Sequence, residues 1–333
     1  MRPDLTGKRI LMQVVPYFGY DRVLADALRA RGATVDVLAD RPFGSAIMHG
    51  VAKLCRPAVL GHATRLYQQQ VAAFGRSHYD HVLVINGQTM SSSYLRQLRV
   101  DFPSARFTFY IWDSFENKPY AVAALRHYDA ALSFDRRAAA THGIGFRPLF
   151  YSPEFDLPAG SAADLDLSFI GTAHSDRPAL IDAIDHNLPS SARRYWFLYL
   201  KAPWVLHYQR LTNRSFRGVP DSMFSYQPMP REKVRDIFMR SRTILDIEHD
   251  RQTGLTIRTF EALGARKKLV TTNPDVRNYD FYDPANIQIL DRRRPGLDPA
   301  FLHAPARELA PALRYRYSVD GWIDDVLGGD HDA

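Results

Sequence analysis

The sequence predicts an α/β protein made of two doubly wound domains, each a parallel sheet covered by helices on both faces. Three observations predict this class. The 333 residues are enough for two domains of about 150 residues each. Short apolar runs alternate with helical stretches, which is typical of βαβ units. Residues 151–163, rich in Pro, Gly, Ser and Ala, interrupt this alternation, and the alternation then starts again.

The first domain is expected to begin with a buried strand and the helix that follows it. Residues 9–15 (RILMQVV) are apolar enough for a strand covered on both faces, and residues 21–31 continue as a helix that ends at Gly32. Residues 46–76 form a long, mainly helical excursion. The remaining strands of this half are expected at residues 34–38, 81–85, 106–112, 130–134 and 146–149.

After the linker, the same pattern predicts a second parallel sheet. Its strands are expected at residues 167–171, 195–200, 243–247, 268–272 and 287–290. Its helices are expected at residues 177–187, 230–241 and 255–263. The expected domains are therefore residues 1–155 and 156–315.

Composition limits the class of protein. The single cysteine, Cys55, excludes a disulfide framework and any multi-cysteine zinc or iron–sulfur site, and it suits a reducing compartment. Residues 1–8 are polar and lack the apolar core of a signal peptide. No apolar run approaches the roughly 20 residues that span a bilayer. We expect a cytoplasmic protein that at most lies peripherally on the inner membrane.

The net charge of +7 lies in the first half of the chain. Residues 1–155 carry 19 Lys and Arg against 12 Asp and Glu, whereas residues 156–333 carry 24 of each. A basic half attracts nucleic acid, anionic lipid or a phosphate-bearing acceptor, and a solvated basic surface is the alternative. Since zinc-finger, RNP-type and heptad patterns are absent from the sequence, we expect no nucleic-acid partner.

Ligands of open parallel sheets bind just beyond the carboxyl ends of the strands. The loops that this rule selects are residues 16–20, 86–90, 113–118 and 135 in the first domain, and 172–177, 248–254 and 273 in the second. These loops are rich in side chains that ionise or form hydrogen bonds. Two such sheets facing each other would form a cleft, and clefts between domains are common ligand sites.

The most informative stretch is residues 243–273, in which a buried strand leads through a polar loop to a new helix near Leu255. Backbone N–H groups and the dipole at a helix start favour a phosphate. Thr256 can add a hydroxyl and Arg258 a fixed cation. Glu261 lies farther along the helix, where a carboxylate can accept hydrogen bonds from a ribose diol. The alternative is that these are ordinary first-turn, surface and solvated helix residues.

Several common catalytic signatures are absent from the sequence. The first strand is not followed by Gly-x-Gly-x-x-Gly, and neither a Walker-type phosphate loop nor a Gly-x-Ser-x-Gly elbow occurs. Dinucleotide redox chemistry, nucleoside triphosphate hydrolysis and serine hydrolysis are therefore disfavoured.

Residues 243–273 resemble the donor-binding segment of GT-B glycosyltransferases, in which a strand, a polar loop and a helix carrying a glutamate hold the nucleotide-sugar. Residues 110–114 (YIWDS), 146–151 (FRPLFY), 167–177 (LSFIGTAHSDR) and 254–263 are similar to bacterial capsule and lipopolysaccharide biosynthesis proteins related to the CgeB-like group. The resemblance covers residues 80–330 and implies the GT-B architecture of two facing Rossmann-like domains. It implies a glycosyltransferase that moves a sugar from a nucleotide-sugar donor to a surface polysaccharide or lipid-linked glycan acceptor. The donor is then a co-substrate, and no further cofactor is expected.

The resemblance also implies roles for single residues. Glu261 would bind the ribose of the nucleotide, while Thr172, His174 and residues 252–258 surround the diphosphate and the sugar. The donor-binding residues expected are Gly171, Thr172, Arg177, Gln252, Thr253, Gly254, Leu255, Thr256, Arg258 and Glu261. Retaining enzymes of this fold often carry two glutamates separated by seven residues, but the earlier position here is Thr253, so the stereochemistry stays open. Residues 317–327 look like the final helix of the family, so residues 316–333 are expected to pack back on the first domain.

Glycosyl transfer needs stabilisation of the leaving diphosphate and, for inversion, a base that deprotonates the acceptor hydroxyl. Asp113 is the first candidate for this base because it ends an apolar strand, where burial raises the pKa of a carboxyl. Glu116 is the nearby substitute, and capping of the following turn is the alternative role of Asp113. His174 and His249 follow strands of the second domain and are candidates for contact with phosphate or sugar.

The remaining candidates concern the acceptor and a metal. Residues expected to contact the acceptor are Tyr17, Phe18, Tyr20, Asn86, Gln88 and Glu116, with packing between loop and sheet as the alternative for the aromatic ones. The pairs Asp164/Asp166 and Asp246/Glu248 have the spacing of a metal chelate. The first pair precedes its strand and the two-sheet layout favours metal-free chemistry, so we expect no metal. The rival to an enzyme is a non-catalytic two-domain protein that binds a nucleotide or a glycan.

Overall fold

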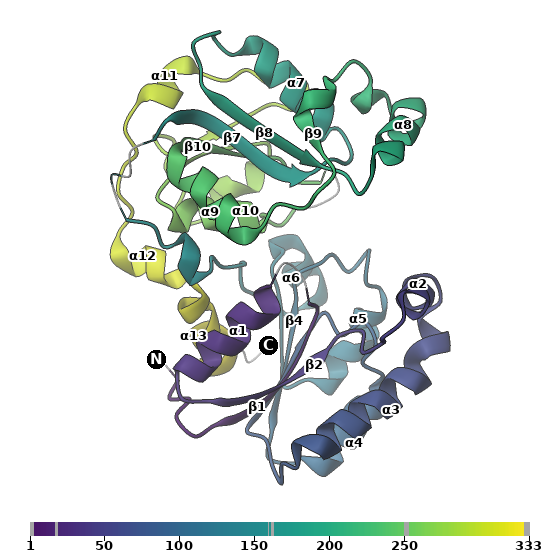
Figure 1. Ribbon diagram of the computed structural model, residues 1–333. Coiled ribbons are helices and arrows are strands. Elements are labelled where there is room, and N and C mark those ends of the chain that lie inside the picture. The colour runs from purple at the N-terminus through teal and green to yellow at the C-terminus, as the bar shows by residue number, and fades with distance from the viewer. Residues whose placement is uncertain (1–2, 17–18, 159, 161–162, 250–252, 330–333) are drawn as a thin grey trace. The chain divides into compact units, whose positions relative to one another are not determined.

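The computed structural model describes residues 3–16, 19–158, 160, 163–249 and 253–329, and it contains two six-stranded sheets in which every pair of neighbouring strands is parallel (Figure 1). The chain divides into unit 1, Met1–Pro148 with Val319–Ala333, and unit 2, Leu149–Ser318. The predicted α/β class with two Rossmann-like sheets is confirmed. The unit boundaries fall after residues 148 and 318, where the sequence led us to expect breaks after residues 155 and 315.

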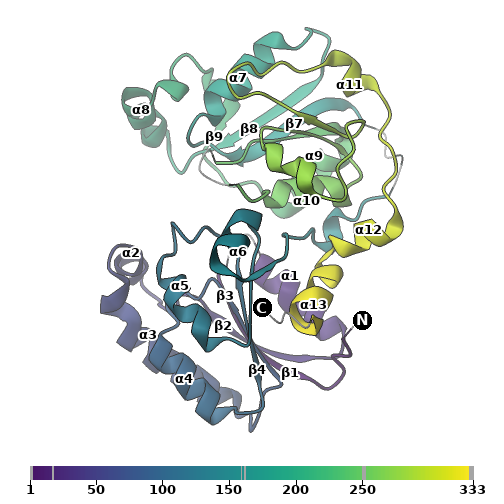
Figure 2. The same cartoon turned by 180° about the vertical axis from the view of Figure 1, so that it is seen from behind.

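Unit 1 has the strand order β2-β1-β3-β4-β5-β6. Its elements are β1 (Arg9–Val14), α1 (Tyr20–Ala30), β2 (Thr34–Ala39), α2 (Ala46–Leu54), α3 (Arg56–Phe74), β3 (His81–Ile85), α4 (Ser92–Asp101), β4 (Arg106–Ile111), α5 (Tyr120–Ala124), η1 (Leu125–His127), β5 (Ala130–Ser133), α6 (Arg136–His142), β6 (Gly145–Phe146) and α13 (Val319–Gly328). Helices α1 and α13 lie on one face of the sheet, and α3, α4 and α5 lie on the other (Figures 1 and 2).

Apolar side chains on both faces explain the central strands of unit 1. The central strands β1, β3 and β4 are buried over almost their whole length, as their apolar sequences predict. The C-terminal helix α13 belongs to this unit, and its Trp322 packs edge-to-face on Tyr110 with ring centroids 4.8 Å apart. The expected excursion at residues 46–76 is two helices, α2 and α3, and Pro57 lies in the first turn of α3. The expected strand at residues 146–149 is shorter, since Pro148 cannot donate to a strand ladder.

Unit 2 has the strand order β12-β11-β10-β7-β8-β9. Its elements are η2 (Pro153–Phe155), β7 (Leu165–Thr172), α7 (Arg177–Asn187), β8 (Arg194–Tyr199), α8 (Pro203–Thr212), η3 (Arg214–Phe216), η4 (Asp221–Met223), β9 (Phe224–Ser225), α9 (Arg231–Arg240), β10 (Ser241–Asp246), α10 (Ile257–Gly264), β11 (Lys268–Thr271), η5 (Pro274–Asn278), β12 (Ile287–Ile289), α11 (Pro299–His303) and α12 (Pro311–Arg316). Helices α7 and α11 lie on one face of the sheet, and α9 and α10 on the other (Figures 1 and 2).

Unit 2 differs from the sequence analysis at the start of α10 and in several elements that were not predicted, among them α8, β9, α11 and α12. Helix α10 begins at Ile257, later than the expected start near Leu255, because Thr256 has extended backbone and caps the helix. Helix α8 was not predicted from the sequence. At the other end of α10, a Cβ on Gly264 would lie 2.5 Å from the ring of Tyr151, so only glycine permits this close approach.

Within the described residues, no helix combines the length and the apolar character that crossing a membrane requires.

Candidate functional site

The loops that follow β7, β10, β11 and β12 gather at one edge of unit 2, called here the carboxyl edge. Arg177, in the first turn of α7, connects two of them. Its Nε donates to Ile247 O at 2.7 Å and its Nη1 to Thr172 O at 3.0 Å. Burial lowers the pKa of this guanidinium, and the carboxylates of Asp246 and Glu248 oppose that effect. Arg177 therefore holds the loop after β7 against the end of β10.

Asp246, the last residue of β10, is buried, and its carboxylate accepts hydrogen bonds from two hydroxyl groups at the start of α10. Thr256 Oγ1 donates to its carboxylate at 2.8 Å and Thr259 Oγ1 at 2.7 Å. Thr256 Oγ1 also accepts from Arg258 N at 3.1 Å. Burial raises the pKa of Asp246, although both hydroxyls favour its charged form. The Thr256 hydroxyl, expected from the sequence to face a phosphate, is thus engaged in fastening α10 to β10.

Arg258 and Glu261 form an ion pair on α10, between Nη1 and Oε2. The Glu261 side chain is only 4% exposed and that of Arg258 is 26% exposed. The guanidinium lies 5.7 Å from the ring centroid of Phe238, so it is supported on that side as well. Glu261 is therefore not the solvated helix residue of the alternative interpretation, and its carboxylate and a cation share one turn of α10.

A second network of ion pairs lies at the carboxyl edge, and the sequence analysis did not predict it. Arg292, just after β12, donates from Nη1 to both carboxylate oxygens of Asp176, at 2.8 and 2.7 Å. Its Nη2 donates to Glu248 Oε1 at 2.7 Å and to Glu248 O at 2.6 Å. Glu248 Oε2 accepts from Thr272 Oγ1 at 2.6 Å. Burial alone would lower the pKa of Arg292, but its bonds to the two carboxylates raise it.

The position of Arg292 carried a signal that the sequence analysis did not use. It follows the predicted strand at residues 287–290 by two positions. Applying the carboxyl-end rule to that strand as well would have selected it.

The two histidine candidates lie together. The rings of His174, after β7, and His249, after β10, stack with centroids 5.3 Å apart and planes 30° apart. Ser175 next to His174 has a φ of 52°, an uncommon conformation for a residue with a side chain, and its carbonyl accepts from Asn213 Nδ2 at 3.1 Å. The structure thus unites two residues that are 75 positions apart in the sequence.

The loop before α10 is fastened by a side chain that follows β11. Asn273 Nδ2 donates to Thr253 O at 2.9 Å, and Gly254 and Leu255 are buried. Gln252 lies outside the described residues. Across the edge, Gly171 is half-buried and Thr172 exposed. A Cβ on Gly171 would lie 2.8 Å from the Phe169 ring, so glycine allows Arg177 and Phe169 to pack there.

In unit 1, Asp113 lies after β4 and its side chain is 33% exposed. Its Oδ1 accepts from Ser114 N at 2.8 Å and from Asn117 Nδ2 at 2.9 Å. Its Oδ2 lies 3.7 Å from Lys118 Nζ. The carboxylate therefore caps the turn that follows, as the alternative interpretation expects. Its second oxygen, Oδ2, lies beside the ammonium group of Lys118.

Asn86 and Gln88, after β3, are buried. Asn86 has a φ of 64° and its Oδ1 accepts from Trp112 N at 3.1 Å. Gln88 N donates to Asp40 Oδ1 at 2.6 Å, and Gln88 Nε2 to Ala52 O at 3.1 Å. Burial raises the pKa of Asp40, a residue the sequence analysis did not select. These side chains hold the loops of unit 1 in place.

The other expected acceptor residues differ in exposure. Tyr20 is the first residue of α1 and is buried, whereas Glu116 is exposed. Tyr17 and Phe18 lie outside the described residues.

The carboxylate pairs considered for a metal are engaged with other partners. Asp164 pairs with Arg240 at 2.6 Å, and Asp166 accepts from Arg193 N at 2.9 Å. Within the described ranges, no three His, Cys, Asp or Glu side chains are placed to hold a metal ion together. Metal independence stays a prediction.

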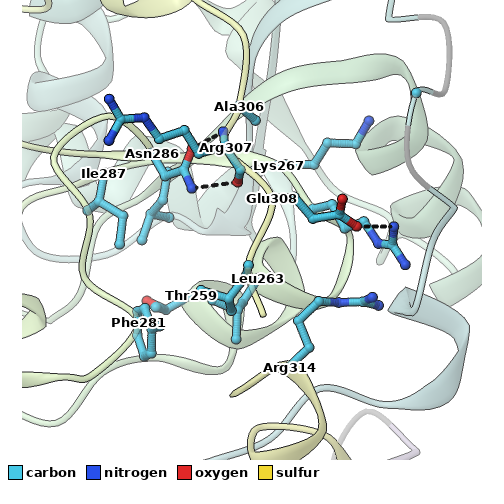
Figure 3. A pocket seen from close by; sticks show the side chains of 14 residues that line it. Thr259, Leu263, Lys267, Phe281, Asn286, Ile287, Ala306, Arg307, Glu308 and Arg314 are labelled. Atoms are coloured by element: carbon cyan, nitrogen blue, oxygen red, sulfur yellow. Dashed lines mark hydrogen bonds and ion pairs between the residues drawn. The ribbon is translucent and has the colours of Figure 1, made fainter. Parts of the chain in front are cut away.

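A cavity of about 250 Å³ lies elsewhere in unit 2, beside the amino ends of β11 and β12 (Figure 3). Leu263, Phe281 and Ile287 contribute its apolar wall. Its three arginines are already paired, Arg266 with Glu308 at 3.2 Å, Arg307 with Asp283 at 3.5 Å and Arg314 with Asp156. This cavity is at the opposite edge of the sheet from the carboxyl edge, so we do not place the candidate site in it.

Lys267 lines this cavity and makes stability depend on pH. Burial lowers its pKa to about 8, while Nζ donates to Met239 O at 2.9 Å. An unfolded lysine titrates near pH ~10.4. Between these values the unfolded chain binds more protons than the folded one, so the free energy of unfolding rises with pH. Lys267→Met should remove this part of the rise, measured by urea denaturation across that range, whereas Lys233→Met on the exposed side of α9 should keep it. An unchanged slope in Lys267→Met would contradict the assignment.

Comparison with known proteins supports the fold. Neither a protein-family model nor a curated protein matches the chain. Among solved structures, Anabaena Alr3699/HepE in complex with UDP and glucose aligns with a TM-score of 0.58 at 10% identity, over 97% of this chain and 100% of that one. The same protein in complex with UDP-glucose aligns at 0.55 and 10%, over 96% and 98%. A glycosyltransferase from Rickettsia africae ESF-5 aligns at 0.53 and 12%, over 96% and 97%. At such identities the likeness shows the fold alone, and that fold is GT-B.

Proposed function

We propose that this chain is a glycosyltransferase that moves a sugar from a nucleotide-sugar donor to a glycan or lipid-linked acceptor. The observation that carries the proposal is the turn of α10 in which buried Glu261 and Arg258 are paired, beside the helix start at the carboxyl edge. The likeness in fold to Alr3699/HepE, which was solved with UDP-glucose, supports it across 96% of this chain.

Unit 2 is proposed to bind the donor. The positive end of the α10 helix dipole and the partly exposed guanidinium of Arg258 offset the charge of a diphosphate, which is the group that leaves. The Glu261 carboxylate accepts hydrogen bonds from the ribose hydroxyls. The stacked His174 and His249 contact the phosphate or the sugar. Arg177 positions the loops after β7 and β10 by donating to Thr172 O and Ile247 O. Its proposed role is to hold the donor site together and not to bind the donor by itself.

Unit 1 is proposed to bind the acceptor, with Asp113 taking the proton of its hydroxyl. Lys118 Nζ lies 3.7 Å from Oδ2 of Asp113, so a cation stands beside the carboxylate that is proposed to take the proton. The proposed acceptor is a capsule or lipopolysaccharide glycan, the sugar a hexose, and the chemistry free of metal. A cytoplasmic location and peripheral contact with the inner membrane belong to the same proposal.

The donor-binding role is tested with Glu261→Ala. Losing a charged hydrogen-bond acceptor for the ribose should weaken nucleotide binding about tenfold or more. Isothermal titration with UDP, GDP, CMP and dTDP measures this, first on the unaltered chain to find the nucleotide. The matched control is Glu232→Ala, an exposed glutamate in the first turn of α9, which should bind as tightly as the unaltered chain.

Two outcomes would count against the proposal. Unchanged affinity in folded Glu261→Ala would remove Glu261 from the donor site. Binding of a nucleotide with no turnover of any nucleotide-sugar would favour a non-catalytic binding protein instead.

A further inference from the structure

Helix α8 carries a row of large apolar side chains on its solvent side. Trp204 is 71% exposed, Tyr208 57% and Leu211 73%. Their spacing of four and three residues places them on one face of the helix. Leu206 on the opposite face is buried in the core of unit 2. Isolated exposed apolar residues are common on soluble proteins, but three large ones in a row mark an interaction surface.

The segment of the chain that contains this row carries charge of one sign. Residues 201–217 contain Lys201, Arg210, Arg214 and Arg217 and no Asp or Glu, although residues 156–333 as a whole are neutral. Arg210 pairs with Asp221 at 2.5 Å, whereas Lys201 and Arg214 lie exposed at the two ends of α8. The surface formed by Trp204, Tyr208 and Leu211 with Lys201 and Arg214 is called here the α8 face.

Helix α8 is held firmly in place. Arg217 donates from Nε to Arg210 O and from Nη2 to Leu211 O, both at 3.0 Å, which caps the last carbonyls of the helix. Asn213 Nδ2 donates to Ser175 O at 3.1 Å and so links the end of α8 to the loop that carries His174. Both views show α8 at the outer margin of unit 2 (Figures 1 and 2). The α8 face is therefore a rigid surface joined to the carboxyl edge.

We propose that the α8 face docks on a membrane surface that contains anionic phospholipids. Trp and Tyr rings settle at the headgroup level of a bilayer, where their apolar part is buried and their polar atom stays hydrated. Lys and Arg beside them are attracted to anionic headgroups, and a short helix with this pattern lies in the plane of the interface. Aromatic anchors with an exposed cation at each end of the helix match this occupant better than they match a neutral protein surface. The inference names a surface for the membrane contact proposed above, and it does not depend on the reaction assigned to the chain.

Vesicle co-sedimentation of the full chain tests the proposal. Vesicles made of equal parts phosphatidylcholine and phosphatidylglycerol should bind it, and vesicles of phosphatidylcholine alone should bind it about tenfold more weakly. The variant Trp204→Ser/Tyr208→Ser/Leu211→Ser should lose about tenfold or more in partitioning. Since all three side chains are exposed, its circular dichroism and melting temperature should match those of the unaltered chain.

The matched control removes three other exposed apolar side chains. Ile47 and Leu54 of α2 are 77% and 89% exposed, and Val100 of α4 is 74% exposed. The variant Ile47→Ser/Leu54→Ser/Val100→Ser should bind vesicles as the unaltered chain does. Loss of binding in this variant, with binding retained in the α8 variant, would place the docking surface in unit 1 and overturn the proposal.

Fluorescence gives a second readout. Trp204 should shift its emission to the blue when anionic vesicles are added, and the shift should vanish in Trp204→Phe while sedimentation persists. No vesicle binding by the unaltered chain would overturn the proposal. So would a dimer in light scattering that dissociates in the α8 variant without any vesicle binding, because the α8 face would then join two copies of this chain.

Discussion

Replacing Asp113 with Asn is expected to lower the rate of sugar transfer about 10²–10⁴-fold, the range typical of losing a general base. The asparagine oxygen can still accept from Ser114 N and Asn117 Nδ2, the two bonds that Asp113 Oδ1 makes in the structure. The turn at residues 114–117 should therefore keep its cap, and the free energy of unfolding should stay within about 0.5 kcal/mol of its original value. Only the charge and the ability to take a proton are removed.

This substitution separates the two interpretations of Asp113. If the carboxylate only caps the turn, Asp113→Asn should be fully active. The rate is measured as nucleoside diphosphate released at saturating donor. Glu116→Gln tests the nearby substitute, and Asp101→Asn, an exposed acid at the end of α4, is the control that should change nothing. Full activity in Asp113→Asn together with a large loss in Glu116→Gln would move the base to Glu116.

Replacing Arg292 with Met is expected to destabilise unit 2 by about 2–4 kcal/mol, because it leaves the buried carboxylate of Glu248 without its half-buried cation. Glu248 would keep the hydroxyl of Thr272 but would lose the guanidinium that now contacts its carboxylate and its carbonyl. Asp176 would lose its partner as well, at smaller cost because it is partly exposed. Chemical denaturation at neutral pH measures the change.

The neighbour Arg293 provides the matched control. It is exposed, so Arg293→Met should change the free energy of unfolding by less than about 0.5 kcal/mol. Adding Glu248→Gln to Arg292→Met should recover part of the loss, since a neutral amide is cheaper to bury than an unpaired carboxylate. Equal stability of Arg292→Met and Arg293→Met would show that the ion pairs of Arg292 with Asp176 and Glu248 contribute nothing to the free energy of unfolding.

The fold could be predicted because its strands carry their own signal. Runs such as RILMQVV at residues 9–15 are apolar on both faces, and the start of β1 follows from that property alone. Helix α8 gave a weaker signal, because Leu206 is buried and Val205 only partly buried against the core, while Trp204, Tyr208 and Leu211 face solvent. A helix that exposes its apolar side lacks the usual amphipathic pattern.

The site could be predicted only as far as its loops. The carboxyl-end rule selected the segments that hold His174, His249, Thr253 and Asp113. It did not select the partner of each side chain. The bonds of Arg292 to Asp176 and Glu248 span 116 and 44 residues, and such pairs depend on how the sheet brings distant loops together. The ion pair of Glu261 with Arg258 is local, but its burial depends on the packing of α10.

The most direct test of the account is the release of nucleotide from a panel of UDP-, GDP-, CMP- and dTDP-sugars by the purified chain. We expect slow hydrolysis of donors that share one nucleotide, with the rate strongly reduced in Glu261→Ala and unchanged in Glu232→Ala. No release from any donor, together with no thermal shift by any of the nucleotides, would contradict the proposal that this chain is a nucleotide-sugar-dependent glycosyltransferase.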